Sequence, residues 1–127
     1  MMYRRRPRGF TLIELLVVLA IVALLASLTL PRYFHSIELA REQVLAENLR
    51  ATRDAIDKFY GDTGRYPDSL DELVDKRYLR ALPFDPIVGS ATAWVIVAPD
   101  AQSKGNVYSL HSAATGSTHD GHAFADL

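Results

Sequence analysis

Near its beginning the chain carries an almost unbroken apolar run of 21 residues, from Phe10 to Leu30. A helix rises by roughly 1.5 Å per residue, so this run would form a helix about 32 Å long. That length is enough to cross the hydrocarbon core of a bilayer. The sequence therefore predicts a membrane-spanning helix over residues 10–30, and the rest of the chain is organised around it.

One ionisable residue interrupts the run. Glu14 lies in the first turn of the expected helix, where inserting a lone carboxylate costs on the order of 2–3 kcal/mol. A carboxylate at such a position normally needs a partner. Glu14 is therefore a candidate functional residue.

A basic leader precedes the run, because residues 4–8 contain four arginines and no acid. Arginines beside a membrane span stay in the cytoplasm, so the remainder of the chain is expected to be exported. Gly9 joins this leader to Phe10. A small, flexible residue there would let a peptidase take the backbone in an extended form and leave the span on the mature protein.

The segment Gly9-Phe10-Thr11-Leu12-Ile13-Glu14, following an arginine-rich leader, resembles the class III signal of type IV pilins and type II secretion pseudopilins. The resemblance implies that prepilin peptidase cuts after Gly9 on the cytoplasmic side and methylates the new amino terminus, Phe10. It also implies that Glu14 pairs with the Phe10 ammonium of a neighbouring subunit during assembly. Such a charge-assisted pair is strong in a low dielectric and registers one helix against the next.

On this resemblance we expect a structural subunit of a periplasmic pseudopilus that drives type II secretion. Its expected partners are further copies of itself in a helical homopolymer, prepilin peptidase, minor pseudopilins and the inner-membrane assembly platform. The expected location is the inner membrane, with the amino terminus cytoplasmic and the body periplasmic. A subunit of a type IV or competence pilus is the alternative within the family.

Two other interpretations come from outside the family. An ordinary secretory signal peptide has an apolar core of only about 7–15 residues, ending at small residues, so this run is too long for one. The second is a monomeric, membrane-anchored periplasmic binding module, in which Glu14 only reaches toward the interface. That module would keep its leader.

Composition narrows the function classes. Removing the four leader arginines from the 14 basic side chains leaves ten against 15 acidic ones, which argues against a nucleic-acid footprint. The chain has no cysteine, so no disulfide staples the body. It also lacks a nucleophile elbow and a phosphate-binding glycine loop, and we do not expect an enzyme.

We divide the chain into a leader (1–9), the transmembrane half of a long helix (10–30), its amphipathic half (31–61) and a periplasmic globular part (62–127). Pro31 should break or kink the helix, since proline has no amide hydrogen to donate. Gly61 and Gly64 should stop it. An apolar stripe at helical spacing predicts the buried face of the second half; its members are Ile37, Val44, Leu45, Leu49, Ile56, Phe59 and Tyr60.

The globular part reads as a small α+β body of pilin-like fold. Ser69 and Glu72 form a capping-box pattern that opens a short helix ending near Lys76. Residues 78–86 should be irregular because they contain two prolines. Strand composition over residues 92–98 and 107–111 predicts an antiparallel pair covering the helix, with Trp94 and Tyr108 as packing residues. The whole block from residues 64–67 to residues 82–86 resembles the same region of major pseudopilins of the G type.

The tail, residues 112–127, is rich in Gly, Ser, Thr and Ala. In G-type pseudopilins the corresponding loop is crowded with acids and binds calcium, which takes six to eight oxygen ligands. Here only Asp120 and Asp126 are carboxylates, so they are weak calcium candidates. His119 and His122 suggest a transition metal even more weakly, for want of a third and fourth ligand. We interpret the tail as a solvated or subunit-facing loop.

Overall fold

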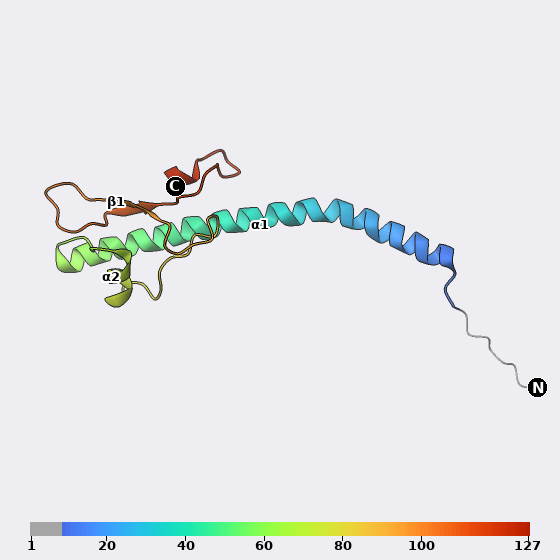
Figure 1. Ribbon diagram of the computed structural model, residues 1–127, viewed down its shortest axis with the longest axis horizontal. Coiled ribbons are helices and arrows are strands. Elements are labelled where there is room, and N and C mark those ends of the chain that lie inside the picture. Colours follow the sequence, from blue (N-terminus) through green and yellow to red (C-terminus); the bar gives the residue numbers. More distant parts are fainter. Residues whose placement is uncertain (1–8) are drawn as a thin grey trace, which may run out of the picture. The chain divides into compact units, whose positions relative to one another are not determined.

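A computed structural model describes residues 9–127, so residues 1–8 of the expected leader lie outside the described residues. Its elements, in chain order, are helix α1 (Leu12–Thr63), helix α2 (Leu70–Asp75), strands β1 (Val95–Val97) and β2 (Ser109–His111), and a short 3₁₀ helix, η1 (Phe124–Asp126) (Figure 1). A long amino-terminal helix with a two-stranded antiparallel sheet is the expected α+β, pilin-like fold. Contacts divide the chain into two units, one ending at Ile37 and the other spanning Glu38–Leu127, and each is described by itself.

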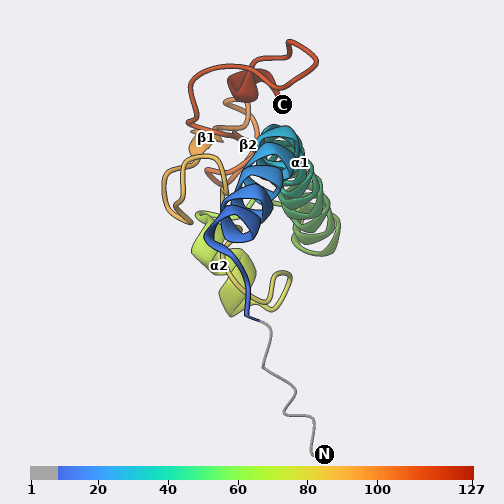
Figure 2. The same ribbon diagram turned by 90° about the vertical axis from the view of Figure 1, so that its right-hand side faces the viewer.

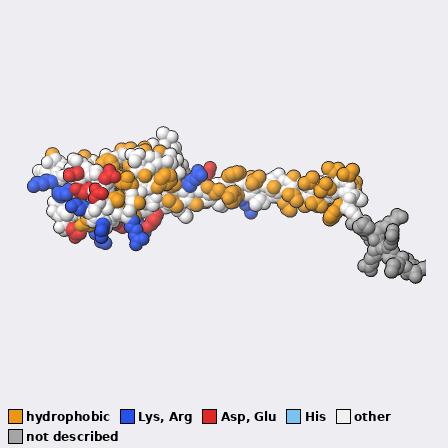
Figure 3. Space-filling view, turned by 60° about the horizontal axis from the view of Figure 1, so that its bottom comes forward, with side chains coloured by type: hydrophobic (Ala, Val, Ile, Leu, Met, Phe, Trp, Pro, Cys, Tyr) orange, Lys and Arg blue, Asp and Glu red, His pale blue; other side chains and the backbone are white. Residues whose placement is uncertain are grey.

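The first unit is a helical segment without a covering layer. Every large apolar side chain from Phe10 to Leu30 is more than half exposed. Figure 3 shows such hydrophobic side chains along the visible face of this segment. Within residues 9–127, α1 is the one helix long and apolar enough to cross a membrane, and none of its apolar window is buried. A helix at the core of a soluble protein would bury that surface, so a lipid environment suits this segment better.

Pro31 lies inside α1 and does not end it. The expected long helix with a proline near its middle is therefore present. Of the two expected effects of Pro31, a break does not occur, and a kink stays a prediction. Proline removes one hydrogen bond of the helix ladder, the one to the carbonyl of Ser27, whereas the bonds on either side remain possible. One missing bond in a helix of 52 residues does not stop it.

The helix passes Gly61 and ends at Thr63, two residues after the first expected stop. Gly64 follows with a φ of 76°, a left-handed conformation that glycine adopts without steric cost, and its amide donates to the Tyr60 carbonyl over 2.8 Å. Thr63 also closes the end, since its hydroxyl bonds the carbonyls of Phe59 and Arg65. Gly64 is thus the stop and Gly61 is an ordinary helical residue.

The second unit packs the carboxy-terminal part of α1 against the remaining elements. Figures 1 and 2 show α2 on one side of the helix, and β1, β2 and η1 on another. Together these elements bury one hydrophobic core, and each large side chain in it contributes about 1.5–3 kcal/mol of transfer free energy. The core consists of Leu45, Leu49, Ala55, Ile56, Phe59, Leu73, Trp94, Val107, Leu110 and Phe124.

The buried stripe of α1 is narrower than the sequence predicts. Leu45, Leu49, Ile56 and Phe59 are buried as expected, but Val44 is 48% exposed and Tyr60 is 43% exposed. The body is small and covers only part of the helix circumference, so residues at the edges of the stripe stay in solvent. Tyr60 instead stacks on Tyr66, with ring centroids 4.5 Å apart.

Helix α2 begins as its capping pattern predicts. Ser69 is the N-cap, and its hydroxyl accepts a hydrogen bond from the Glu72 amide over 3.4 Å. The Glu72 carboxylate reaches back one residue further than in a standard box, to the amide of Asp68. Arg65 donates to both oxygens of Glu72, at 2.8 and 3.2 Å. This bidentate contact lowers the pKa of Glu72 and raises that of Arg65.

The two expected strands exist, pair antiparallel and are shorter than the sequence suggests. Val95 pairs with His111, Ile96 with Leu110 and Val97 with Ser109. Leu110 is the residue of the pair that enters the core, whereas β1 leaves Val95 and Ile96 nearly half exposed. The sheet is therefore a small cover over the helix rather than a complete layer.

The two aromatic residues expected to pack behave differently. Trp94 is 8% exposed and its indole donates to the Pro83 carbonyl over 2.8 Å, so it belongs to the core. Tyr108 is 52% exposed and packs at the surface, with its ring edge to face on that of Tyr66 at 5.4 Å between centroids. Its neighbour Val107 takes the buried position instead, so Tyr108 packs outside the core.

A buried polar contact fixes the irregular segment that follows α2. Asp85 is 2% exposed, and one of its carboxylate oxygens accepts the amides of Ile87 and Val88 at 2.9 and 3.1 Å. The other oxygen accepts the hydroxyl of Ser112, which is fully buried, over 2.5 Å. A buried carboxylate is costly unless its lone pairs are satisfied, and here three donors satisfy them. Asp85 thereby links this segment to the start of the tail.

Candidate functional site

The expected cleavage point is open in the structure. Gly9, Phe10 and Thr11 precede the first helical residue, so the bond between Gly9 and Phe10 lies outside the helix. Phe10 is 90% exposed. Apart from Gly9 and its chain neighbours, no atom of the described residues lies within 4 Å of a Cβ built on Gly9. A peptidase that needs an extended, accessible backbone would meet no obstacle from the fold here.

Thr11 and Glu14 cap the start of α1 reciprocally. The Glu14 amide donates to the Thr11 hydroxyl over 3.2 Å, and the Thr11 amide donates to the Glu14 carboxylate over 3.3 Å. The pair satisfies two of the four amides that a helix start leaves without a partner, and the negative charge lies at the positive end of the helix dipole. Glu14 therefore has a structural role in the single subunit.

The sequence reasoning did not include this cap, although the signal was present. Thr11-Leu12-Ile13-Glu14 matches the pattern of Ser or Thr followed three residues later by Glu, the same pattern that correctly predicts the start of α2. Glu14 stands out in the sequence as a charge within an apolar run, whereas its capping role depends on its position three residues after Thr11. Capping lowers the cost of keeping this carboxylate near a membrane, since one oxygen accepts a backbone amide.

The tail folds into a tight hairpin. Ser117 bridges to Ala123, and the Thr118 amide donates to the His122 carbonyl over 2.7 Å. Gly121, at a φ of 86°, makes the turn, and Phe124 inserts into the core immediately afterwards. The tail is therefore a defined loop attached to the body at its base.

Glu42 of α1 holds the tip of this loop. One of its oxygens accepts the His119 amide over 2.9 Å, and the other accepts the His119 Nδ1 over 2.6 Å. His119 Nε2 also contacts the Asp120 carboxylate. The hydrogen bond to Glu42 is the main cause that raises the pKa of His119, and Asp120 adds to it. The sequence placed Glu42 on the solvent face, because a contact across 77 positions has no local signal.

Arg53, also placed on the solvent face, fastens the base of the same tail. It donates to the carbonyls of Leu110 and Leu127, at 2.9 and 2.5 Å, and to the Ser109 hydroxyl at 3.3 Å. His111 Nδ1 also lies 3.0 Å from the Leu127 carbonyl. Polar residues of α1 thus bind strand β2 and the tail.

Comparison with known proteins agrees with this geometry. Residues 4–30 match the family described as the prokaryotic N-terminal methylation motif. The type II secretion system core protein G of Aeromonas hydrophila is 36% identical over 101 residues, which cover 67% of this chain and 71% of that protein. The core protein G of Klebsiella michiganensis is 31% identical over 124 residues, 85% of each chain. The chain belongs to the type II secretion system core protein G family.

The relation to pilins is more limited. The type IV major pilin protein PilA of Myxococcus xanthus is 34% identical over 71 residues, which cover 56% of this chain and 32% of the pilin. Core protein G relatives instead match along most of the chain, including the folded body. No solved structure matches the chain significantly.

The tail offers few carboxylates for the calcium site that the resemblance to G-type pseudopilins implies. Calcium takes six to eight oxygen ligands, usually including several carboxylates. Asp120 contacts His119, and Asp126 is an exposed residue of η1. Over residues 9–127, no group of three or more His, Cys, Asp or Glu side chains is placed to hold a metal ion. Calcium binding through Asp120 and Asp126, or transition-metal binding through His119 and His122, stays a prediction.

Proposed function

We propose that this chain is a structural subunit of a periplasmic pseudopilus that drives type II protein secretion. One observation carries the proposal: an exposed, non-helical Gly9–Phe10 bond lies directly before a capped helix whose apolar run has no cover. A secreted or soluble protein has no use for such a helix after processing. The resemblance of the folded body to core protein G relatives supports the secretion system as the setting.

The first step is maturation. Prepilin peptidase cuts after Gly9 on the cytoplasmic side of the inner membrane and methylates Phe10, leaving α1 as the membrane anchor. The exposure of Phe10 and the empty space around Gly9 support this step. The body then lies in the periplasm, because the leader arginines stay in the cytoplasm.

The second step is polymerisation, which needs no catalysis by the chain itself. The Glu14 carboxylate pairs with the Phe10 ammonium of the neighbouring subunit, and the apolar faces of the helices pack in the filament core. Since water is absent there, the ion pair is strong, and its charge-assisted hydrogen bond is directional, so the pair sets the register of one helix on the next. Minor pseudopilins and the inner-membrane platform are the proposed assembly partners.

An experiment on assembly tests this function. The full chain is produced in cells that carry either a type II secretion platform or a type IV pilus machine, and surface or periplasmic filaments are isolated from both. The proposal predicts filaments containing this chain with the secretion platform. Incorporation only by the pilus machine would favour a pilus or competence pilin instead. An unprocessed monomer in both would favour the membrane-anchored binding module.

We also propose that the tail of this subunit is closed without calcium. Glu42 supplies from α1 the two acceptor oxygens that hold the loop tip, and Phe124 holds its base in the core. A loop already fixed at both ends gains little from an ion. Asp120 and Asp126 would then be surface residues of the filament rather than ligands.

A further inference from the structure

Four residues follow Pro31 at the end of the apolar run, and among the described residues none of their side chains joins the core or the proposed assembly step. They are Arg32, Tyr33, Phe34 and His35. All four are exposed, and the two aromatic side chains are each 60% exposed. The two rings contact one another edge to face, with centroids 6.0 Å apart. Two large aromatic side chains exposed on an uncovered helix would be more stable in contact with lipid or with another molecule than in water.

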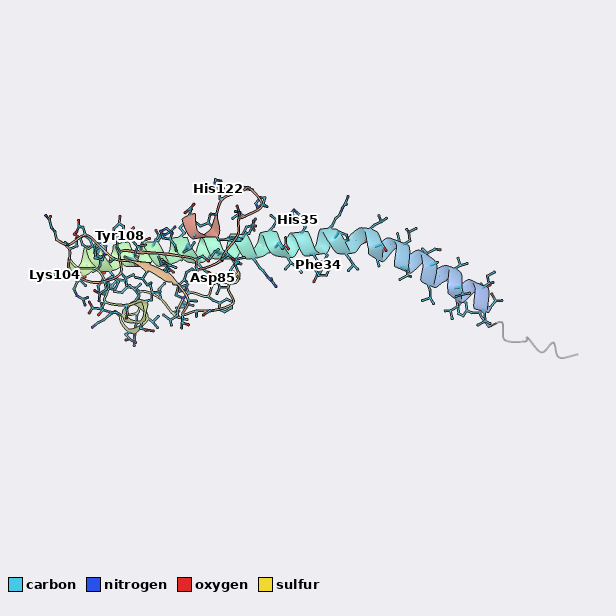
Figure 4. All side chains as sticks on the ribbon, turned by 45° about the horizontal axis from the view of Figure 1, so that its top comes forward. Phe34, His35, Asp85, Lys104, Tyr108 and His122 are labelled. Atoms are coloured by element: carbon cyan, nitrogen blue, oxygen red, sulfur yellow. The ribbon has the colours of Figure 1, made fainter. Side chains whose placement is uncertain are left out.

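The positions of these four residues along the helix indicate whether they suit a protein partner on one face or a layer that surrounds the helix. Successive residues of an α-helix are turned by roughly 100°, so four in a row point in directions that encircle it. Figure 4 shows Phe34 and His35 on different sides of α1. A face that packs against another protein would place its aromatic residues three or four positions apart, on one stripe. This arrangement is a ring, which suits surroundings that are alike on all sides.

The ring lies at the depth of a membrane interface. Arg32 is 22 residues after Phe10, a rise of roughly 33 Å, close to the thickness of a bilayer's hydrocarbon core. Aromatic residues with a polar edge are enriched at that level. An arginine there reaches lipid phosphates with paired hydrogen bonds, and its long stem reaches outward to them. Arg32 forms no ion pair among residues 9–127 that would compete.

We propose that Arg32, Tyr33, Phe34 and His35 form an interfacial girdle that binds the phospholipid headgroup layer on the side of the folded body while the subunit is anchored. This inference rests on the membrane-anchored state in the proposed function. The girdle fixes how deeply α1 sits in the bilayer before assembly. It must leave the headgroups when the subunit is pulled into the filament, so it adds to the resistance against extraction.

The chain has no cysteine, so a single one can carry a spin label. The full chain is placed in vesicles of phosphatidylethanolamine and phosphatidylglycerol, with the label at Ser36→Cys, which leaves the girdle intact. Leu19→Cys and Ala46→Cys serve as references. Depth is measured from the relative collision rates with oxygen and a water-soluble nickel complex. We expect the Ser36 label at the headgroup level, the Leu19 label deep in the bilayer and the Ala46 label in water.

A second variant tests the girdle itself. Tyr33→Ser with Phe34→Ser should broaden or shift the depth of the Ser36 label, whereas the control pair Val44→Ser with Tyr60→Ser, which also removes two exposed side chains, should not. An unchanged depth in the girdle variant overturns the inference. So does dipolar coupling between Ser36 labels that persists at large lipid excess, since a second copy would then cover the ring. If the Leu19 label also lies in water, the anchored state itself fails, and the proposed function fails with it.

Discussion

Thr11 and Glu14 exchange two hydrogen bonds at the first turn of α1, each side chain accepting the other's amide, at 3.2 and 3.3 Å. One residue thus carries two separable roles: Glu14 caps its own helix in the single subunit, and its charge is proposed to pair with Phe10 of a neighbour in the filament. A substitution by alanine removes both roles at once. Matched variants are needed to separate them.

Three variants make this separation. Glu14→Gln keeps an acceptor for the cap and removes the charge, whereas Thr11→Ala keeps the charge and weakens the cap by about 1 kcal/mol. Glu14→Ala loses both. We expect all three to be processed normally, and filament yield to fall strongly in both Glu14 variants but little in Thr11→Ala. Filaments are quantified by shearing and sedimentation. Normal filament yield from Glu14→Gln would remove the proposed role of the charge.

Gly9 allows an equally direct comparison. No described atom lies near a Cβ at this position, so neither Gly9→Ala nor Gly9→Leu strains the fold. Any effect must arise at the peptidase. We expect Gly9→Leu to block processing and Gly9→Ala to reduce it much less, as judged by the fraction of unprocessed chain on gels. Complete maturation of Gly9→Leu would show that the cut lies elsewhere.

If Glu42 closes the tail loop, the stability of that loop should not depend on calcium. Hydrogen exchange of the amides over residues 117–122 should be the same with calcium and with a chelator. In Glu42→Ala the exchange should be faster, because the His119 amide and ring lose their acceptors. Glu47→Ala is the matched control, since Glu47 pairs only with the exposed Arg50. Slower amide exchange in the wild-type loop on adding calcium would show that the loop binds calcium, and would contradict closure by Glu42 alone.

The Arg65–Glu72 contact predicts a response to acid. Because Arg65 lowers the pKa of Glu72, the contact stabilises the fold fully above the ordinary carboxyl pKa of 4.5. That stabilisation is lost as the pH falls through the lowered value in the folded state. The slope should be small, since the Arg65 side chain is 34% exposed and partly screened. Thermal unfolding in detergent between about pH 3 and 6 measures it. In Glu72→Gln the part of this pH dependence that arises from the Arg65–Glu72 contact should vanish. If the variant and the wild type lose thermal stability identically as the pH falls, the contact is not its cause.

Local signals in the sequence predicted most of the fold. The apolar run, the Ser69–Glu72 cap and the two strands depend on neighbours in the chain, and each lies where its pattern indicates. The long helix continues through Pro31 because it tolerates one missing hydrogen bond. The sequence could not predict the width of the buried stripe, since that width depends on how much of the helix the small body covers.

The candidate site also combines residues of a local sequence motif with residues whose contacts are distant in the chain. Gly9, Phe10 and Glu14 belong to one continuous motif that the sequence alone shows, and their roles in cleavage, methylation and assembly stay predictions. Glu42 and Arg53 bind the tail over 70 or more positions, and nothing near them in the chain marks those contacts. Charged residues at helical spacing were interpreted as a solvated face, which is correct for Arg50 but not for these two.

The amino terminus of the mature protein shows directly whether this chain follows the prepilin pathway. The full chain is recovered from membranes of cells with and without a prepilin peptidase, and its first residue and intact mass are determined. We expect a peptidase-dependent product that begins at Phe10 and is heavier by one methyl group. An intact leader in both samples would contradict it and leave a plain membrane-anchored module.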